Sequence, residues 1–368
     1  MKPLLIILSW IYAAVIAIRH RLYNWGVFKS YSFNIPIVCI GNITVGGTGK
    51  TPMAEMLISE LSSSYTIAML SRGYGRRTKG YHEVSCSDSY RDVGDEPLQV
   101  KLKFPEAVVV VSEDRVSAIE RIQKEHPEVN LIIMDDGFQH RKVRAKVNIV
   151  ILDATRPHES DRLLPAGRLR DLKSRLSAAH FFIVSKCSEQ MSPLDRRLWR
   201  NNLRTIAYQK VYFSHIVPQS IEPVFYFEDR EYVDYGSQVI LLAGVGNPRP
   251  FIREAQVRFN VVEKMIVPDH HSYSMEDMKL LYDMLVRHPR AIILMTEKDA
   301  VKLFRAKGLP ERLRRAMYYQ PIETRLMEGP DKDFTGNLIA EIEFKDENGE
   351  RSRGKARGKR VNLDDNEI

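Results

Sequence analysis

A glycine-rich stretch, VGGTGKTP at residues 45–52, carries the residue types that bind phosphate. Glycine leaves backbone N–H groups open to an anion because it has no Cβ, and a helix that follows adds the positive end of its dipole. Lys50 would then reach the outer phosphates, and the Thr51 hydroxyl would bind Mg²⁺. We therefore predict that a nucleotide binds here. The residues expected to contact it are Thr44, Val45, Gly46, Gly47, Thr48, Gly49, Lys50 and Thr51.

The match to the general phosphate-binding pattern G-x-x-x-x-G-K-[ST] is incomplete at its first position. That position holds Thr44 instead of glycine, although Gly46 and Gly47 add flexibility. An apolar run, IPIVCIG, precedes the loop, and a helical pattern, MAEMLISELSS, follows it. This context of strand, loop and helix favours nucleotide binding over an ordinary glycine-rich turn.

Two adjacent carboxylates, Asp135 and Asp136, follow an apolar run in NLIIMDDGFQH. In proteins with this type of loop, an acid at the end of a neighbouring strand holds Mg²⁺ or its water opposite the loop Ser or Thr. A solvated strand end would have a similar sequence, but adjacent acids directly after apolar residues favour the metal role. We predict that Asp135 or Asp136 binds the metal together with Thr51.

Two further segments contain groups that could transfer a proton. Asp95 in VGDEP could cap the helix that begins there, or it could accept the proton of a hydroxyl group near the γ-phosphate. On the residue alone, capping is favoured. His270 lies in VPDHHSY, where Asp269 and His271 could orient it, although an isolated His is more often a surface or core residue.

An arginine-rich loop, SRGYGRR, supplies Arg72, Arg76 and Arg77 after a predicted strand. These side chains could hold anionic substrate groups in a bidentate manner, or they could be a solvated charge cluster, and the sequence favours neither. The TEKD segment is similar to the guanine-specificity sequence of GTPases, but that sequence requires Lys where this chain has Glu297. A preference for GTP is therefore not supported.

Apolar runs without alternation, separated by helical patterns, must position these groups. Over residues 30–205 they predict one α/β domain whose mostly parallel sheet is covered on both faces, with a helix around GRLRDLKSRLSAA. Residues 206–238 become alternating and aromatic, which predicts a two-stranded antiparallel linker. Residues 239–344 predict a second, smaller α/β domain. A chain of 368 residues is long for a single core, which agrees with two domains.

The first 29 residues predict a membrane-associated helix. Residues 3–18 carry no charge, and Arg19 and Arg21 follow at once. Sixteen helical residues span about 24 Å, which is shorter than the hydrocarbon core of ~30 Å. No clear cleavage site of a signal peptide follows. We expect this helix to lie in the inner leaflet with its arginines on anionic lipid, the alternative being a helix packed on the protein's own core.

The charge of the chain is unevenly distributed. The formal net charge is +8, and much of the excess lies in RSRGKARGKR, within a basic tail at residues 345–368 that we predict to be disordered. Such a tail suits nucleic acid or an anionic membrane as well as a solvated end, and the solvated end is favoured. Three cysteines without metal-ligand spacing fit a reducing compartment.

Several of these segments occur together and in the same order in one known family. GNITVGGTGKTP, SRGYGRR, VGDEP, DDGFQH, LLPAGRLRD, GVGNPRPF, VPDHHSY and TEKDAVK resemble tetraacyldisaccharide 4′-kinase, the lipid A kinase of Gram-negative bacteria. The resemblance extends to about residue 325 and includes the missing first glycine. It implies two α/β/α domains and transfer of the γ-phosphate of ATP to the 4′-hydroxyl of tetraacyldisaccharide 1-phosphate, which gives lipid IVA. It also implies monotopic attachment to the cytoplasmic face of the inner membrane.

The resemblance assigns roles to individual residues. Lys50 and Thr51 would hold phosphates and Mg²⁺, and Asp135 or Asp136 would complete the metal and water shell. Asp95 resembles the family's base toward the 4′-hydroxyl, which replaces the capping preference above.

Three further assignments come from the same resemblance. His270 resembles the partner of Asp95 from the second domain, and Arg72 would contact phosphate or substrate. Asp171 stands where the family commonly has Glu, so the carboxylate is kept on a side chain one methylene shorter and its role in substrate binding is less secure.

Two other functional classes must be distinguished from a lipid kinase. A membrane-associated P-loop ATPase that acts as a switch would use the same loop, acids and apolar helix, but it leaves the second domain unexplained. A nucleic-acid-binding protein depends on the basic tail alone, so no nucleic-acid partner is expected.

Overall fold

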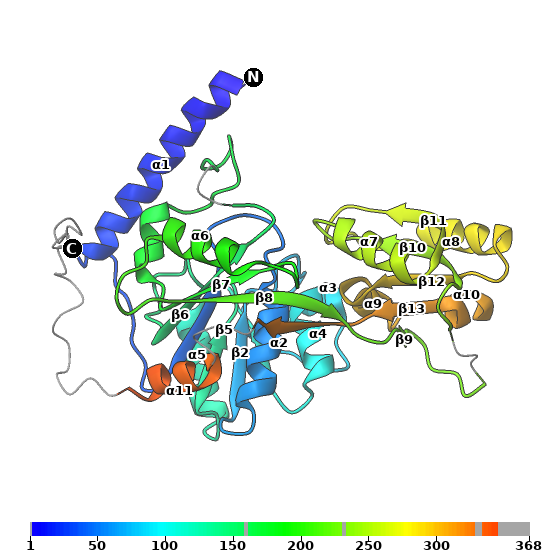
Figure 1. The fold of residues 1–368 in the computed structure, drawn as a ribbon. Helices are drawn as coiled ribbons and strands as arrows, with labels where there is room; N and C mark the ends of the chain where they lie inside the picture. Colours follow the sequence, from blue (N-terminus) through cyan, green and yellow to red (C-terminus); the bar gives the residue numbers. More distant parts are fainter. Residues whose placement is uncertain (1, 158–160, 230–232, 328–332, 345–368) are drawn as a thin grey trace.

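The protein consists of two α/β units that lie side by side and are joined by long strands (Figure 1). The computed structural model describes residues 2–157, 161–229, 233–327 and 333–344. The predicted basic tail, 345–368, lies outside the described residues. The predicted α/β fold with a large, mostly parallel sheet and a second, smaller sheet is confirmed.

The larger sheet has nine strands in the order β14-β8-β7-β6-β1-β5-β2-β4-β3. Neighbours are parallel from β8 to β4, and the two outermost pairs are antiparallel. The strands are β1 (Ile37–Gly41), β2 (Ile67–Ser71), β3 (His82–Glu83), β4 (Val108–Val111), β5 (Leu131–Met134), β6 (Val147–Asp153), β7 (Phe181–Ser185), β8 (Lys210–Pro218) and β14 (Ile322–Leu326). The carboxyl ends of the parallel strands meet at one edge, where α/β proteins bind their ligands.

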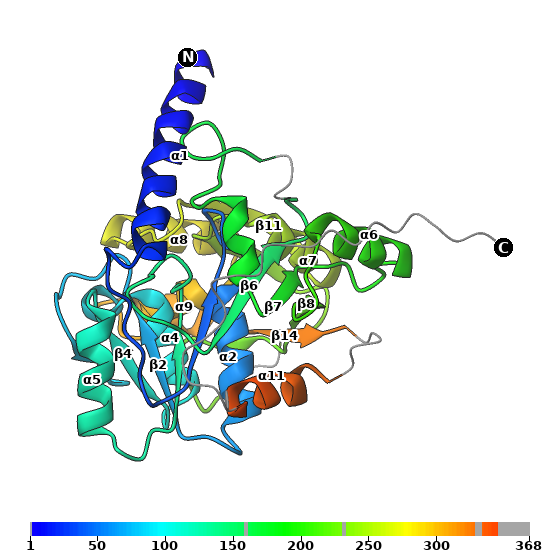
Figure 2. The same ribbon diagram turned by 90° about the vertical axis from the view of Figure 1, so that its left-hand side faces the viewer.

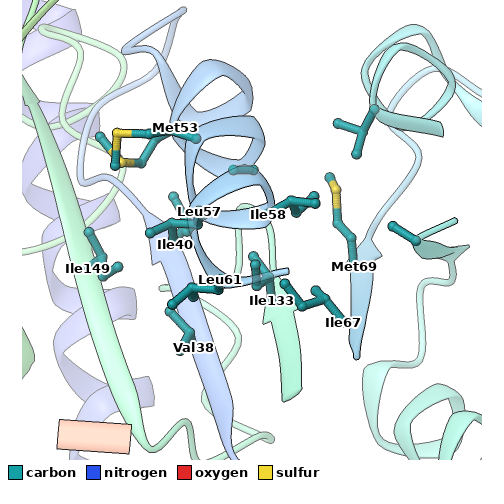
Figure 3. Packing of buried hydrophobic residues seen from close by; sticks show 14 of the residues in the cluster. Val38, Ile40, Met53, Leu57, Ile58, Leu61, Ile67, Met69, Ile133 and Ile149 are labelled. Atoms are coloured by element: carbon teal, nitrogen blue, oxygen red, sulfur yellow. The ribbon is translucent and has the colours of Figure 1, made fainter. Parts of the chain in front are cut away.

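One face of this sheet is covered by α2 (Lys50–Leu61), α4 (Asp95–Lys103) and α11 (Phe334–Glu343). In α2, Leu57, Ile58 and Leu61 are almost fully buried and pack on apolar side chains of β1, β2 and β5 (Figure 3). A buried apolar side chain of this size contributes about 1.5–3 kcal/mol. This packing fixes the direction of α2, and therefore of the loop that precedes it.

The opposite face is covered by α5 (Arg115–Glu125), which buries Ala118, Ile119 and Ile122, and by the end of α6 (Pro193–Leu203). Figure 2 shows α5 and α11 on opposite sides of the sheet. Since both faces are covered, the inner strands are apolar throughout, as the sequence predicts. A short helix, α3 (Tyr90–Val93), precedes α4.

The smaller unit contains a five-stranded sheet in the order β11-β10-β12-β13-β9, in which only the β13–β9 pair is antiparallel. Its strands are β9 (Glu222–Pro223), β10 (Gln238–Ala243), β11 (Asn260–Ile266), β12 (Ile292–Thr296) and β13 (Met317–Gln320). Its helices are α7 (Arg249–Arg258), α8 (Met275–Arg287), α9 (Glu297–Leu303) and α10 (Glu311–Ala316). Helix α9 also contributes Val301 to the core of the larger unit, so the two units are in direct contact.

The two units are joined by an antiparallel strand pair, but its second strand differs from the prediction. β8 pairs with β14, from Ile322↔Pro218 to Leu326↔Ser214, and not with the described residues of the range 224–235. β8 also continues the parallel sheet beside β7. The alternating pattern of residues 206–238 marks β8 correctly, but no local turn links it to its partner, because that partner lies about a hundred residues further along the chain.

The chain returns to the larger unit after β14. Helix α11 buries Phe334, Leu338 and Ile342 in the core of the larger sheet, near β6 (Figure 1). The sequence analysis places these residues in a second domain of residues 239–344, and the structure places their side chains in the first.

Helix α1 (Lys2–Asn24) projects from the larger unit and extends beyond the uncharged segment, past Arg19 and Arg21 (Figures 1 and 2). At 1.5 Å per residue its 23 residues span about 34 Å. The stretch Pro3–Asn24 is long and apolar enough to cross a membrane by length and composition alone. The sequence analysis takes this helix to be shorter than the hydrocarbon core of a bilayer. The helix in the structure is longer, so its length does not argue against a membrane span.

Candidate active site

The glycine-rich loop connects β1 to α2 at the carboxyl edge of the larger sheet. Gly46 (φ 102°) and Gly49 (φ 92°) have left-handed backbone angles that favour glycine. The loop is braced from both sides. Asn42 Nδ2 donates to Thr48 Oγ1 at 2.7 Å, and Ser185 Oγ at the end of β7 donates to the Thr48 carbonyl at 2.7 Å. A braced loop of this kind holds its backbone N–H groups in place before a ligand binds.

The first two residues of the predicted contact set are already engaged by another segment. The Val45 N–H donates to the Arg168 carbonyl at 2.8 Å, and Thr44 forms a bridge with Leu169. The Val45 N–H is therefore not free to bind an anion unless it gives up this hydrogen bond. The segment after β6 adds this strand-like pairing to the loop, and the local sequence has no signal for it.

Lys50 and Thr51 occupy the first turn of α2. Lys50 Nζ lies 3.7 Å from Asp136 Oδ1, at the end of β5. Thr51 is buried, with 8 % of its surface exposed. The structure therefore brings the predicted lysine and acidic pair together.

Asp136 is held by cations. The Arg170 guanidinium donates to both carboxylate oxygens of Asp136, and its Nη1 lies 3.0 Å from Oδ2. Burial alone would raise the pKa of Asp136, but the hydrogen bond from Arg170 and the charge of Lys50 outweigh it and hold the pKa below its usual range. Asp136 therefore stays ionised and acts as a counter-ion between Lys50 and Arg170.

Asp135 differs from its neighbour in its hydrogen bonding and in the direction of its pKa shift. Only 1 % of its surface is exposed, and among the described residues its Oδ1 accepts no hydrogen bond. Burial, together with the negative charges of Glu96 and Asp136, raises its pKa to about 7. A buried carboxylate oxygen without a partner suits a small, hard cation. Within the described residues no cluster of three His, Cys, Asp or Glu side chains could hold a metal ion by itself.

Asp95 and His270 meet across the two units. His270 Nδ1 lies 3.0 Å from Asp95 Oδ2, although the residues are 175 positions apart. Asp95 is not the N-cap of α4. Gly94 occupies that position, while Asp95 is the first helical residue and its Oδ1 accepts from the Glu96 N–H at 3.0 Å. The capping interpretation made from the residue alone is therefore wrong.

The two groups stabilise each other's charge. Burial alone would raise the pKa of Asp95, but the hydrogen bond from His270 and the charges of Lys298, His270 and Lys302 hold it below its usual range. The hydrogen bond to Asp95 raises the pKa of His270 above its usual value, against burial and the charge of Lys298. Because an ionised carboxylate only accepts hydrogen bonds, the proton lies on His270 Nδ1.

Lys298, which the sequence analysis does not identify, links this pair to its surroundings. Its Nζ lies 3.1 Å from Glu96 Oε1, 3.2 Å from Asp269 Oδ1, 3.4 Å from His270 Nε2 and 3.7 Å from Asp95 Oδ2. It belongs to TEKD, whose first residue caps α9 through the Thr296 side chain. The sequence indicates that Thr296 caps a helix. It does not indicate that the Lys298 side chain points toward the larger unit.

The loop that carries His270 is positioned by glycines and a buried acid. A Cβ at Gly244 would lie 2.8 Å from Asp299 Oδ1, so only glycine fits there. Asp299 is fully buried and accepts from the Gly244 N–H and from the Tyr273 hydroxyl, each at 2.9 Å. His270 itself has a positive φ of 58°, and its ring lies 5.1 Å from the Tyr74 ring. The packing therefore holds an unfavourable backbone geometry at the residue that contacts Asp95.

Arg72 is exposed after β2, at the same edge of the sheet. Its charge acts on Arg115, the first residue of α5, which is 5 % exposed. Burial and the charge of Arg72 lower the pKa of Arg115, while Asp135 and Asp136 oppose this effect. Arg115 therefore lies close enough to the acidic pair to interact with it, and Arg72 lies close to Arg115. The sequence does not mark Arg115 as a site residue, because many helices begin with a polar residue shortly after an apolar strand.

Asp171 does not lie free in a substrate site. It is 1 % exposed, and its Oδ1 lies 2.6 Å from His20 Nε2 on α1. The predicted helix around residues 167–179 is shorter than expected and is a 3₁₀ helix, Lys173–Ala178. The residues before it cannot be helical because their backbone groups pair with the glycine-rich loop.

Known proteins match both the chain and its fold. The sequence model of the family described as Tetraacyldisaccharide-1-P 4′-kinase matches residues 1–342. A protein named tetraacyldisaccharide 4′-kinase from Porphyromonas gingivalis is 38 % identical over 355 residues, covering 94 % of this chain and 97 % of its own. One of the same name from Bacteroides fragilis is 37 % identical over 350 residues, 93 % of each chain.

A solved structure has the same overall arrangement. It is the crystal structure of an "apo" form of LpxK from Aquifex aeolicus in complex with ATP. The TM-score is 0.71 at 25 % sequence identity, covering 93 % of this chain and 99 % of the other.

Proposed function

The chain belongs to the tetraacyldisaccharide-1-P 4′-kinase family, and from this premise we propose which of its residues perform the reaction. The enzyme is an ATP-dependent phosphotransferase of lipid A biosynthesis. It transfers the γ-phosphate of ATP to the 4′-hydroxyl of tetraacyldisaccharide 1-phosphate, an acylated glucosamine disaccharide, and forms lipid IVA. An ATPase switch that phosphorylates no lipid is not favoured, because relatives that match nearly the whole chain are named as kinases.

The loop from Gly46 to Thr51 is proposed to hold the triphosphate of ATP. Its bracing by Asn42 and Ser185 supports this role, as does the position of Lys50 at the N-terminus of α2. Lys50 would exchange its contact with Asp136 for the outer phosphates, which carry more charge.

Mg²⁺ is proposed to be held by Asp135 and Thr51. The orphaned buried oxygen of Asp135 fits a cation, whereas Asp136 is already neutralised by Arg170. With few protein ligands available, the remaining positions would be filled by phosphate oxygens and water, as is usual for Mg²⁺. When bound, the ion would neutralise charge that develops on the transferred phosphoryl group.

Asp95 is proposed as the group that accepts the proton of the 4′-hydroxyl. A carboxylate with a lowered pKa is ionised at neutral pH, whereas an imidazole with a raised pKa is more often protonated and cannot accept. His270 would orient Asp95 and stabilise its charge. Glu96, next to Asp95, is close enough to Asp135 to raise its pKa, so this pair and the proposed metal site border the same space.

The contact between the units supports a second proposal, that their closure completes the site. Asp95 comes from the larger unit, while His270 and Lys298 come from the smaller one. A site that forms only on closure keeps water away from the phosphoryl group. ATP hydrolysis in the absence of lipid should accordingly be slow.

Attachment to the cytoplasmic face of the inner membrane is proposed to occur through α1. Exposed apolar side chains cover much of this helix, and they are Leu4, Leu5, Ile7, Leu8, Trp10, Ile11, Val15 and Ile18. Its remaining side contacts the larger unit through buried Ser9 and His20, which a helix surrounded by lipid could not do. An acylated substrate leaves the bilayer only at a cost of about 0.8 kcal/mol per CH₂ group, so the enzyme must reach it there.

The observation that carries the proposed mechanism is the hydrogen bond between Asp95 and His270. It is tested by incubating the protein with [γ-³²P]ATP, Mg²⁺ and detergent-dispersed tetraacyldisaccharide 1-phosphate. Label should enter the lipid, and Asp95→Asn should lower kcat by about 10²–10⁴ while ATP affinity stays near that of the parent.

Asp92→Asn, in the neighbouring helix α3, serves as the control and should retain the parental rate. Transfer by Asp95→Asn at the parental rate would show that the proton acceptor is a different group. Release of phosphate without labelled lipid would favour the ATPase switch.

A further inference from the structure

A continuous chain of polar contacts links α1 to the nucleotide loop, and it passes through His20 and Asp171, which the proposed mechanism does not use. His20 is 7 % exposed and Asp171 is 1 % exposed. His20 Nε2 donates to Asp171 Oδ1 at 2.6 Å, since a carboxylate can only accept. The other ring nitrogen, Nδ1, lies 3.3 Å from Nη1 of Arg141 and accepts a hydrogen bond from it. These two contacts fix the ring in one orientation.

Asp171 belongs to a segment that lies along the nucleotide loop. The Arg170 N–H donates to the Ile43 carbonyl at 2.8 Å, and the Val45 N–H donates to the Arg168 carbonyl at 2.8 Å. The Arg170 side chain continues in the same direction and bonds to Asp136 and to the Asn42 side chain. A displacement of Asp171 would therefore displace the cation that holds Asp136 beside Lys50.

Helix α1 contacts the same segment at two further points. Ser9 Oγ donates to the Leu163 carbonyl at 2.8 Å, and the Tyr12 hydroxyl donates to the Arg170 carbonyl at 3.1 Å. Ser9, Tyr12 and His20 lie at intervals of three or eight residues, which places them on one side of a helix. Both views show the chain between β6 and β7 beside α1 (Figures 1 and 2). The seating of α1 is thus specified by hydrogen bonds, in addition to apolar contact.

The burial of Asp171 makes its bond to His20 decisive for the position of this segment. Among the described residues, its Oδ1 accepts only from His20 and from the Leu172 N–H, the latter at 2.8 Å, and its buried Oδ2 has no partner. If His20 is removed, a buried carboxylate loses its main donor, and the segment must move to let water reach it. Arg170 is the adjacent residue and would move with it.

We propose that His20 and Asp171 are positioning residues, through which the docking of α1 holds Arg170 against Asp136 and thereby sets the affinity of the nucleotide site. This inference rests on the nucleotide site of the proposed function. Because coupling between two binding events is reciprocal, ATP would in turn favour the docked position of α1.

The test compares ATP affinity and kinetics in the full chain, kept in detergent micelles. His20→Ala should weaken binding of ATP, measured by calorimetry with Mg²⁺ present, by about tenfold, within the 5–150-fold range of typical couplings. The KM for ATP should rise in parallel, while kcat at saturating ATP changes less. His20→Gln keeps an N–H donor that can reach Asp171, so it should restore most of the affinity.

A matched control is available on the outer edge of the larger sheet. His82 Nε2 lies 2.9 Å from Asp88 Oδ2, so His82→Ala removes a similar pair that does not touch the nucleotide loop. Its ATP affinity should equal that of the parent. In an Arg170→Ala background, His20→Ala should add little further loss, because its effect passes through Arg170.

The possible outcomes separate this inference from the proposed function. If the parent does not bind ATP, the nucleotide site itself is wrong. If the parent binds ATP and His20→Ala binds it equally tightly, even with a lower thermal midpoint, the pair is only structural and the positioning role is overturned. Failure of His20→Gln to recover affinity, or full additivity of the His20 and Arg170 substitutions, would overturn it as well.

Discussion

His270 of the smaller unit donates a hydrogen bond to Asp95 of the larger unit, with Nδ1 and Oδ2 3.0 Å apart. This bond joins the start of α4 to the loop after β11, and Lys298 lies against both residues. The proposed proton acceptor is therefore fully assembled only when the two units are in contact.

Removing His270 should change the pH dependence of phosphoryl transfer. The lowered pKa of Asp95 keeps it ionised at acidic pH, so kcat/KM should decline only at low pH in the parent. In His270→Ala, only Lys298 and Lys302 would oppose the rise in the pKa of Asp95 that burial causes. The acidic limb of the kcat/KM profile should therefore move to higher pH. In the parent, loss of the His270 proton should lower the rate on the alkaline side, above the usual value of 6.5.

The control for this pH experiment is in the same loop. His271 Nε2 lies 3.0 Å from Asp277 Oδ2, away from Asp95, so His271→Ala should leave the acidic limb in place. An unchanged acidic limb in His270→Ala would contradict the assignment of Asp95 as acceptor.

The two adjacent carboxylates should respond differently to substitution. Asp135→Asn removes the proposed Mg²⁺ ligand, so the Mg²⁺ concentration that gives half-maximal activity should rise at least tenfold. Asp136→Asn removes the counter-ion of Arg170 and Lys50, so the KM for ATP should change more than the Mg²⁺ requirement. Magnesium titrations at fixed ATP measure both. Equal responses would show that the two acids share one role.

Neutralising Lys298 should impair the contact between the units. Lys298→Met keeps most of the side-chain volume but leaves Glu96 and Asp269 without their shared cation. Both acids are about a third exposed, so solvent screens part of the loss, and we expect a modestly lower thermal midpoint and a kcat at least tenfold lower. Lys279 is exposed on α8 of the same unit, and Lys279→Met should change neither quantity. A parental kcat in Lys298→Met would exclude the proposed role in closure.

A charge on the exposed side of α1 should weaken membrane binding. Trp10 is 69 % exposed, and a large apolar side chain contributes about 1.5–3 kcal/mol when buried. Trp10→Glu should therefore reduce co-sedimentation with vesicles of anionic phospholipid by tenfold or more. Tyr226→Glu, at a residue 81 % exposed on the smaller unit, should bind as the parent does. Unchanged binding of Trp10→Glu would place the membrane contact elsewhere.

The sequence predicts those parts of the site that depend on a local pattern. Gly49, Lys50 and Thr51 lie at a helix start because an apolar strand precedes them and an amphipathic segment follows. Asp135 and Asp136 lie beside them because the carboxyl ends of parallel strands share one edge. The pairing of Asp95 with His270 is implied only by the resemblance to a family, since nothing local relates residues 175 positions apart.

The parts that the sequence could not predict depend on long-range contacts of charged or irregular segments. Arg170 and Lys298 are two of many basic residues, and their direction is set by carboxylates that approach from other elements. The alternation of apolar and polar residues in β8 does not identify its partner strand. That partner, β14, has the same kind of pattern as other short strands and lies far along the chain. The bond between His20 and Asp171 was missed for the same reason.

The position of α11 has a consequence for biosynthesis. Phe334, Leu338 and Ile342 complete a core whose other members are mostly encoded before residue 215. When the ribosome has released strands β1 to β8 of the larger sheet, the apolar surface that these side chains cover is still exposed. This surface stays exposed until the smaller unit has been translated and the chain has returned to the larger unit as β14 and α11. We expect the nascent chain to need protection from aggregation over that interval, and the smaller unit to reach its native state first.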